Sequence, residues 1–277
     1  MMRIGIVDYY LSEWHANNYP AWLVKAGESL AIEAKVTVAW AEKEISPVDG
    51  VSTDAWCEKN GVLRADSIES LCESCDAIMI LAPSDPDKHL QYTKQVLPYG
   101  KPTFIDKTFA PDLATAQEIF MLAERYGTPI FSSSALRFAQ ELLTFENVRN
   151  LIVTAGGSNA EEYLVHPLEM AISLLGDRVE RVWVDRQGEQ LLCHAETESG
   201  KQATVVFAQR LPYTVATEDG EGKSGYAPIK SDFFGGLMKT ALRFFADGKP
   251  PFDPAETLEI MRVRDAILAQ IVNDLHF

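Results

Sequence analysis

The stretch Asp76-Ala77-Ile78-Met79-Ile80-Leu81-Ala82-Pro83 decides the fold of this chain. It is a nearly unbroken apolar run, which is typical of a central parallel strand because helices cover both faces of a parallel sheet. In such sheets ligands bind outside the carboxyl ends of the strands, where the strand order reverses. The run therefore predicts a buried strand, and it places Ala82 and Pro83 at the edge where a ligand site is expected.

Strand and helix patterns alternate on both sides of this run. Apolar β patterns occupy residues 3–7, 36–40, 62–64, 103–105 and 129–132, and helical patterns occupy residues 14–26, 67–75, 89–97 and 113–126. Alternation of this kind produces a doubly wound parallel sheet with right-handed crossovers. We predict an α/β Rossmann domain over residues 1–133.

The pattern changes after residue 134. β segments at 151–154, 181–185, 191–196 and 203–208 are separated by turns, and the last three predict an antiparallel meander. A helix over 163–175 precedes the meander, helices over 233–246 and 255–275 follow it, and residues 218–230 have the composition of a flexible loop. We predict an α+β open-sheet domain over 134–277 for substrate binding and oligomerisation, with the last helix returning to the first domain.

Composition narrows the classes of protein. The 277 residues are 47% hydrophobic and 23% charged, an ordinary globular balance, with a net charge of −15. That charge disfavours nucleic acids and anionic lipid surfaces, which bind clustered Lys and Arg. No apolar run reaches the ~20 residues of a membrane helix, and the first residues enter a strand pattern at once. We expect a cytoplasmic protein with a small-molecule substrate.

The cysteines give no sign of a metal site. Cys72 and Cys75 form one CxxC pair, and no second pair stands at the spacing of a zinc site. A redox pair would lie at the start of a helix, whereas this pair ends one. We predict reduced, partly buried thiols and no bound metal.

Two segments carry residues suited to proton chemistry. Lys107 directly follows the strand at 103–105, at the same sheet edge as Pro83. Glu162, His166 and Glu169 share one helix face because they are four and three residues apart. A lysine, a carboxylate and a histidine in one cleft could bind a sugar hydroxyl and move its proton. The alternatives are a solvated surface lysine, a histidine in the first helical turn before Pro167, and an exposed acidic face.

The order of these motifs resembles the glucose–fructose oxidoreductase/inositol dehydrogenase/MocA-like (Gfo/Idh/MocA) family. The family has a D-A-V-x-I-x-T-P strand end, then H, G-K-H-V, E-K-P, R-F, D-x-G-x-H-x-x-D and L-L-G. The matching positions here are the strand ending at Pro83, His89, Gly100-Lys101, Asp106-Lys107-Thr108, Arg137-Phe138, His166 and Leu174-Leu175-Gly176. Members are NAD(P)-dependent oxidoreductases that act mostly on sugars, polyols and related compounds.

The resemblance implies roles for particular residues. Lys107 matches the lysine beside the nicotinamide and substrate, and His166 matches the acid/base histidine. Glu162 stands where the family has an aspartate, and Arg137 and Glu169 are expected to contact substrate. Hydride transfer is the chemistry of the cofactor, and the protein supplies geometry and proton traffic. Lys107 and His166 are expected to lie together in the interdomain cleft, in a homo-oligomer (dimer or tetramer).

The resemblance also implies a dinucleotide site, with NAD or NADP as the cofactor. Its contacts are expected along the carboxyl edge of the first sheet. The expected residues are Asp8, Tyr9, Tyr10, Leu11, Glu42, Ala82, Pro83, Asp106 and Lys107. Glu42 is the acidic residue nearest to the position of the family's ribose contact, and no arginine follows it that would favour NADP.

The first turn departs from the family. Where the family has G-x-G-x-x-G, this chain has Asp8-Tyr9-Tyr10-Leu11-Ser12-Glu13. Glycines let the backbone approach the pyrophosphate at a helix N-terminus, whereas here two tyrosines add bulk and two carboxylates add negative charge. We predict weak dinucleotide affinity. Two functions stay open: an oxidoreductase that binds NAD(P) differently, and a cofactor-free binding, regulatory or lyase-like protein for a sugar derivative.

Overall fold

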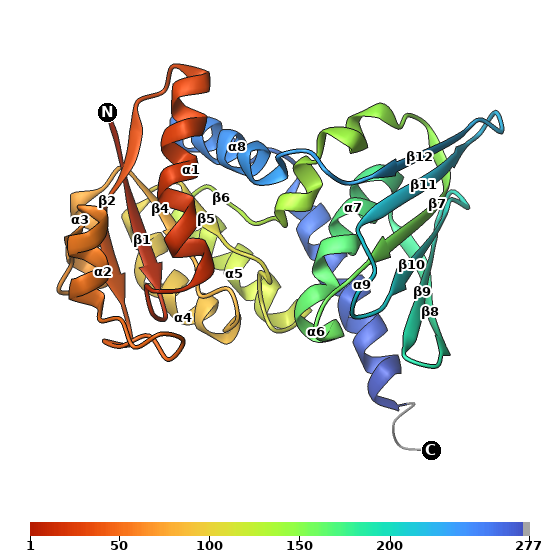
Figure 1. Cartoon of the computed structure of the whole chain (residues 1–277), viewed down its shortest axis with the longest axis horizontal. Helices are drawn as coiled ribbons and strands as arrows, with labels where there is room; N and C mark the ends of the chain where they lie inside the picture. Colours follow the sequence, from red (N-terminus) through yellow and green to blue (C-terminus); the bar gives the residue numbers. More distant parts are fainter. Residues whose placement is uncertain (274–277) are drawn as a thin grey trace. The chain divides into compact units, whose positions relative to one another are not determined.

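The computed structural model describes residues 1–273, which form two compact units (Figure 1). The first comprises Met1–Ser133 and Leu237–Pro254, and the second comprises Ser134–Gly236 and the chain from Ala255 onward. The sequence predicted that the last helix returns to the first domain. In the structure the chain from Ala255 onward belongs to the second unit, and the segment that returns to the first unit is Leu237–Pro254.

The first unit contains a six-stranded parallel sheet with the order β3-β2-β1-β4-β5-β6. The strands are β1 (Met2–Asp8), β2 (Ala34–Ala41), β3 (Leu63–Arg64), β4 (Ala77–Ile80), β5 (Thr103–Ile105) and β6 (Ile130–Phe131). β4 is buried along its whole length, as its apolar sequence predicted. The strand order reverses between β1 and β4, so the switch point lies where these two strands end. The predicted Rossmann fold is confirmed.

Five helices connect these strands. They are α1 (Trp14–Leu30), α2 (Thr53–Asn60), α3 (Ile68–Ser74), α4 (Asp87–Val96) and α5 (Leu113–Tyr126), and Figure 1 shows α1 and α3 beside the strands. The sequence analysis missed α2, because eight residues span little more than two turns and give weak periodicity. A Cβ on Gly5 would lie 2.7 Å from Cδ2 of Leu71, so the glycine in β1 lets α3 pack closely.

The CxxC pair lies where the sequence predicted, at the end of a helix just before a strand: Cys72 is in the last turn of α3 and Cys75 is its C-cap. All four cysteines are free and buried. Burial raises the pKa of Cys72 to about 12 and that of Cys75 to about 11, so both stay protonated thiols at neutral pH. They are part of the core rather than a redox pair.

The second unit contains a six-stranded mixed sheet with the order β12-β11-β7-β10-β9-β8. The strands are β7 (Val148–Ala155), β8 (Val179–Gln187), β9 (Gln190–Thr197), β10 (Gln202–Phe207), β11 (Thr214–Asp219) and β12 (Ser224–Pro228). β8, β9 and β10 form the predicted antiparallel meander, and β10 pairs in parallel with β7. The α+β open sheet is confirmed.

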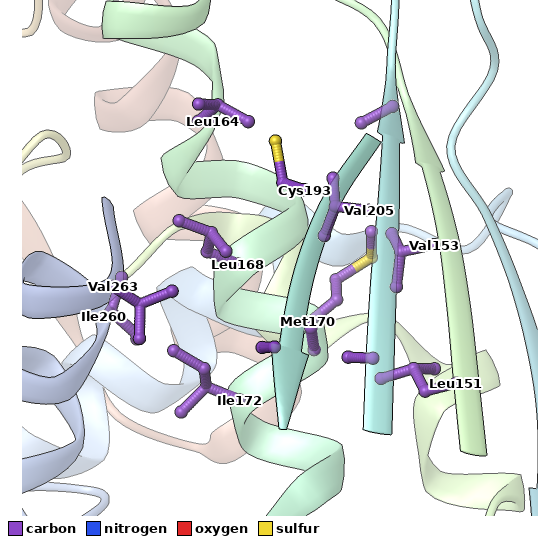
Figure 2. Close-up of a cluster of buried hydrophobic side chains, with 14 of the residues drawn as sticks. Leu151, Val153, Leu164, Leu168, Met170, Ile172, Cys193, Val205, Ile260 and Val263 are labelled. Carbon is purple, nitrogen blue, oxygen red and sulfur yellow. The ribbon is translucent and has the colours of Figure 1, made fainter. Parts of the chain in front are cut away.

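Helices cover one face of this sheet. They are α6 (Ala160–Tyr163), α7 (Val165–Leu175) and α9 (Pro254–Asn273), while α8 (Phe233–Asp247) runs across the boundary between the units. In Figure 2, Met170 of α7 reaches toward Val153 and Val205 of the sheet, and Ile172 lies toward Ile260 of α9. These side chains belong to one buried cluster, so α7 is packed on two sides.

The prediction of a flexible loop over residues 218–230 is wrong. β11 and β12 form an antiparallel hairpin there, and β11 also pairs with β7. The segment is polar and contains three glycines, so it lacks the apolar alternation of a strand. Its order comes from pairing with β7, which local sequence does not reveal. The predicted end of the last helix, beyond 273, lies outside the described residues.

The other face of the second sheet carries a row of paired residues that crosses all six strands. In strand order from β8 to β12 the row is Trp183, His194, Thr204, Ile152, Ala216 and Tyr226. Trp183, Ile152 and Tyr226 are exposed, by 36%, 50% and 67%.

The predicted homo-oligomer stays a prediction. No helix within residues 1–273 is long and apolar enough to cross a membrane.

Candidate functional site

Asp8 lies at the switch point, at the end of β1. Its Oδ1 accepts hydrogen bonds from the backbone N–H groups of Tyr9 (2.7 Å) and Ala82 (3.0 Å), and so ties the ends of β1 and β4 together. Its Oδ2 is buried and accepts no hydrogen bond. Burial, and next the charge of Glu13, raise the pKa of Asp8 well above its usual range. The Asp8 carboxyl group is therefore a structural part of the turn, and its surroundings favour the protonated, neutral form of the group.

Glu13 is the N-cap of α1. Its carboxylate accepts hydrogen bonds from the backbone N–H groups of His15 (2.7 Å) and Ala16, and it also lies 3.2 Å from Nδ1 of His15. Glu13 is only 7% exposed. The positive end of this helix thus already holds a carboxylate of the chain itself.

His15 links Glu13 to Asp106, which follows β5. Nε2 of His15 lies 3.6 Å from Oδ2 of Asp106, and the Tyr19 hydroxyl donates to Oδ1 of Asp106 (3.2 Å). Burial lowers the pKa of His15, but the charge of Asp106 and the contacts with Glu13 outweigh it, so the pKa is raised. The protonated form of His15 is thus favoured by the buried acidic cluster around it, which comprises Asp8, Glu13 and Asp106.

Glu42 follows β2, where the resemblance places a ribose contact. Its Oε1 accepts from Nζ of Lys88 (2.6 Å), and its Oε2 accepts from the Tyr92 hydroxyl (2.9 Å). Burial opposes the ionised form, but these two hydrogen bonds outweigh it and lower the pKa of Glu42. Both carboxylate oxygens are therefore engaged within the first unit, and a ribose would have to share them.

The rest of the first turn packs inward or against lysine. Leu11 is 1% exposed, and Lys43 holds its Nζ 4.4 Å from the centre of the Tyr9 ring. Burial raises the pKa of Tyr10, which keeps its phenol neutral. The turn is compact and held by its own side chains, unlike a glycine loop that leaves room for a ligand.

Lys107 is buried, so it is not the solvated surface lysine that the sequence analysis gave as an alternative. It is 8% exposed, and its Nζ donates to the carbonyl oxygen of Pro83 (3.3 Å). The ends of β4 and β5 therefore meet at one edge, as predicted. Ala82 has a φ of 46°, in the left-handed region, and the Lys107–Thr108 peptide is cis.

His166, on α7 in the second unit, has a partner that the sequence analysis missed. Its Nδ1 lies 2.7 Å from Oγ of Ser134, which also accepts from the backbone N–H of Leu136 (3.3 Å). The rings of Tyr163 and Tyr213 lie 5.8 and 6.3 Å from the imidazole. Ser134 precedes the Arg137-Phe138 motif by three residues, but nothing in the sequence links it to His166.

The two residues predicted to contact substrate lie in a buried ion-pair network. Arg137 pairs with Glu169 (Nη1 to Oε1, 3.4 Å) and with Glu256 of α9. Arg137 is 11% exposed and Glu169 only 3%. This network joins the segment after Ser134 to α7 and α9, and a role in substrate binding stays a prediction.

The structure thus brings together the residues predicted for the cofactor. Asp8 ends a strand of the first sheet, and the others lie just after the carboxyl ends of its strands: Glu42, Ala82, Pro83, Asp106 and Lys107. Glu162 is half-buried on α6, where its backbone N–H donates to Oδ1 of Asn159. The prediction that Lys107 and His166 share one site stays a prediction, because they belong to different units.

We expect Asp8→Asn to stabilise the protein at pH 7–8. A raised pKa means that the folded protein keeps a proton which the unfolded chain releases above about pH 4, so stability falls as pH rises toward the folded pKa. Asparagine has no proton to lose, and its Oδ1 can still accept from Tyr9 and Ala82. Urea unfolding across pH 4–8 should show the gain growing with pH.

Asp76→Asn is the matched control. The hydrogen bonds and charge of Arg3 lower the pKa of Asp76, so its contribution is present above about pH 4 and lost as pH falls. This variant should lose stability at neutral pH. If Asp8→Asn also loses stability at pH 7, Asp8 is ionised in the folded protein.

The geometry on its own defines a class. A parallel sheet of order 3-2-1-4-5-6 with residues gathered at its switch point is a Rossmann nucleotide-binding unit, here followed by a mixed-sheet unit. Residues 36–134 match the model of a family described as "Oxidoreductase family, NAD-binding Rossmann fold" (GFO_IDH_MocA). Over this part the chain is similar to the Gfo/Idh/MocA family, and its first turn, which lies before the matched residues, lacks the glycine-rich motif.

One curated protein is similar to part of this chain. "Uncharacterized oxidoreductase YhhX" of Escherichia coli (strain K12) is 30% identical over 77 residues, 28% of this chain and 22% of that protein. The alignment thus spans less than a quarter of the curated relative.

Two solved structures share the fold of the whole chain. A probable dehydrogenase from Thermotoga maritima superposes with a TM-score of 0.80 at 13% identity, covering 99% of this chain and 97% of that one. UDP-N-acetylglucosamine 3-dehydrogenase GnnA from Acidithiobacillus ferrooxidans gives 0.74 at 12% identity, covering 97% of each. At such identities the likeness concerns the fold.

The family implies a dinucleotide, but the residues of the first turn do not fit its pyrophosphate. The helix N–H groups that would bind it donate to Glu13, and the neighbouring Asp8 and Asp106 are buried carboxyl groups. No glycine stands between Asp8 and Glu13 to admit a phosphate. Within residues 1–273 no cluster of His, Cys, Asp and Glu is placed to hold a metal ion.

Proposed function

We propose that the chain is an oxidoreductase acting on a hydroxyl or carbonyl group of a sugar-like small molecule, with His166 as the group that moves the proton. The hydrogen bond between His166 Nδ1 and Ser134 Oγ carries this proposal. A hydroxyl can accept a hydrogen bond from a protonated Nδ1 or donate one to an unprotonated Nδ1. Ser134 can therefore support both protonation states of His166, as an acid–base group requires.

The family supports the substrate class. The resemblance described in the sequence analysis implies a sugar or polyol as substrate, and a structure with the same fold is a UDP-N-acetylglucosamine 3-dehydrogenase. Lys107 would polarise the reacting oxygen and Glu162 would orient His166, as the resemblance implies. Arg137 and Glu169 would position the segment after Ser134, and this segment would in turn contact the substrate. Their buried ion pair favours such an indirect role in substrate binding.

NAD or NADP would supply the hydride chemistry in this family. Since the first turn does not fit a pyrophosphate, the cofactor would have to be held by other groups at the carboxyl edge of the sheet, with weak affinity.

A second function is favoured by the same turn: a cofactor-free binding, regulatory or lyase-like protein for a sugar derivative. Its supporting observation is the carboxylate of Glu13 at the N-terminus of α1.

A titration with NAD⁺, NADH, NADP⁺ and NADPH separates the two functions. A ligand at about 100 times its dissociation constant stabilises a protein by about 2.7 kcal/mol, which a thermal-shift assay detects easily. We expect a shift only at concentrations far above micromolar. Absence of any shift up to millimolar concentrations would favour the cofactor-free function, and submicromolar binding would contradict our description of the turn.

A further inference from the structure

We infer that the Glu13 carboxylate is a built-in substitute for the pyrophosphate of a dinucleotide. In Rossmann folds the pyrophosphate lies at the N-terminus of the first helix, where backbone N–H groups point at it. Here Glu13 takes those donors, so the chain itself closes this position. The inference does not depend on the proposed redox function, because it concerns binding alone.

The hydrogen bonds of the turn support this substitution. The N–H groups of His15 and Ala16, at the second and third positions of α1, both donate to the Glu13 carboxylate. Before the helix, Tyr9 donates to Asp8 Oδ1 and the Glu13 N–H donates to the carbonyl of Leu11 (2.8 Å). These N–H groups already have acceptors within the turn. A bound pyrophosphate would have to break several of their hydrogen bonds.

The side chain of Glu13 is fixed rather than free to swing aside. It is 7% exposed, and its Oε2 also contacts His15, whose ring packs edge-on against Tyr19 at 5.1 Å. Asp106 holds both His15 and Tyr19 from the end of β5. Expelling Glu13 would therefore disturb a network that reaches from α1 to β5.

Charge acts in the same direction. The charges of Glu13 and, to a smaller extent, Asp106 add to the effect of burial in raising the pKa of Asp8. Like charges that lie close together in a poorly solvated site repel strongly. A pyrophosphate would bring further negative charge to this cluster, whereas the Glu13 carboxylate is compensated by the helix N-terminus and His15.

Glu13→Gly tests the inference by opening the position. Glycine is tolerated at an N-cap at a cost of only a few tenths of a kcal/mol, so α1 should stay folded. Isothermal titration with NADH and with inorganic pyrophosphate should show affinity at least about tenfold higher than in the unchanged protein, or about 1.4 kcal/mol. Glu13→Gln, which keeps an acceptor oxygen in place, should gain much less.

Asp112→Gly is the matched control, because Asp112 is the carboxylate N-cap of α5 in the same unit and accepts from Thr115 (2.7 Å). It should leave nucleotide and pyrophosphate affinity unchanged. If Glu13→Gly does not fold, Glu13→Ser serves in its place, since serine caps well and is shorter. A folded variant with unchanged affinity overturns the inference, as does an equal gain in Glu13→Gln. Neither assay contains a substrate, so failure of the redox proposal does not affect them.

Discussion

His166→Ala is expected to lower turnover of the substrate by about 10²–10⁴-fold, the usual contribution of a general acid–base group. The substrate is first sought by screening sugars and polyols for binding and for turnover. Ser134→Ala should lower the rate by about tenfold or less, because it removes one hydrogen bond worth about 1 kcal/mol while leaving the imidazole. It should also shift the pH profile, which a purely structural effect would not do.

His194→Ala is the control. His194 also holds a hydroxyl at its Nδ1, that of Thr204 at 2.9 Å, but it lies on the open face of the second sheet. Its loss should leave turnover unchanged. If the protein only binds its ligand, His166→Ala will instead weaken affinity by about 1–3 kcal/mol. A lower melting temperature with no effect on ligand would mean that His166 serves only packing.

Lys107→Ala tests whether Lys107 and His166 act in one step. Residues that act as a unit are strongly non-additive, so the double variant should be hardly slower than the worse single variant. Additive losses would indicate separate roles. Full activity in both single variants would show that the family's catalytic residues do not carry over to this chain.

Arg137→Ala is expected to cost about 3–5 kcal/mol of stability, the usual effect of breaking a buried ion pair by removing one partner. The reason is Glu169, which is 3% exposed and would lose the guanidinium that compensates its charge. Urea unfolding measures the loss. Replacing Arg137 and its buried partner together, in Arg137→Met with Glu169→Leu, should recover much of the loss, because the remaining partner, Glu256, is 35% exposed and can be solvated.

Arg178→Ala is the matched control on the surface. Arg178 and Glu198 form an ion pair at 3.0 Å, but they are 71% and 53% exposed, so its loss should cost less than about 1 kcal/mol. If Arg137→Ala is equally mild but abolishes ligand binding, then Arg137 is a direct substrate contact rather than a structural residue.

Much of the fold could be predicted because local patterns suffice for parallel sheets. β4 is buried on both faces, so its sequence is apolar throughout, and the alternation around it predicted the Rossmann unit. For the second unit, the sequence predicted an α+β open sheet and its antiparallel meander. Its hairpin β11–β12 was not predicted, since β11 is ordered by pairing with β7, and β12 by pairing with β11. The helix α2 was missed because of its shortness.

The candidate site was predictable only in part. Strand ends are visible in a sequence, so Asp8, Ala82, Asp106 and Lys107 could be placed at one edge of the sheet. The burial of Lys107 and the engagement of Glu42 by Lys88 and Tyr92 could not, because they depend on residues far apart in the chain. Ser134 escaped notice for the same reason, being 32 residues from His166.

The sequence by itself determined the fold class, the resemblance to a family and the departure of the first turn from that family's glycine pattern, because each depends on residue types in a local order. Only the tertiary structure decided what fills that turn. A glutamate at the start of a helix can point to solvent or fold back on the helix, and the sequence permits both. Packing with His15, Tyr19 and Asp106 selects the second, and so places the chain's own carboxylate at the N-terminus of α1.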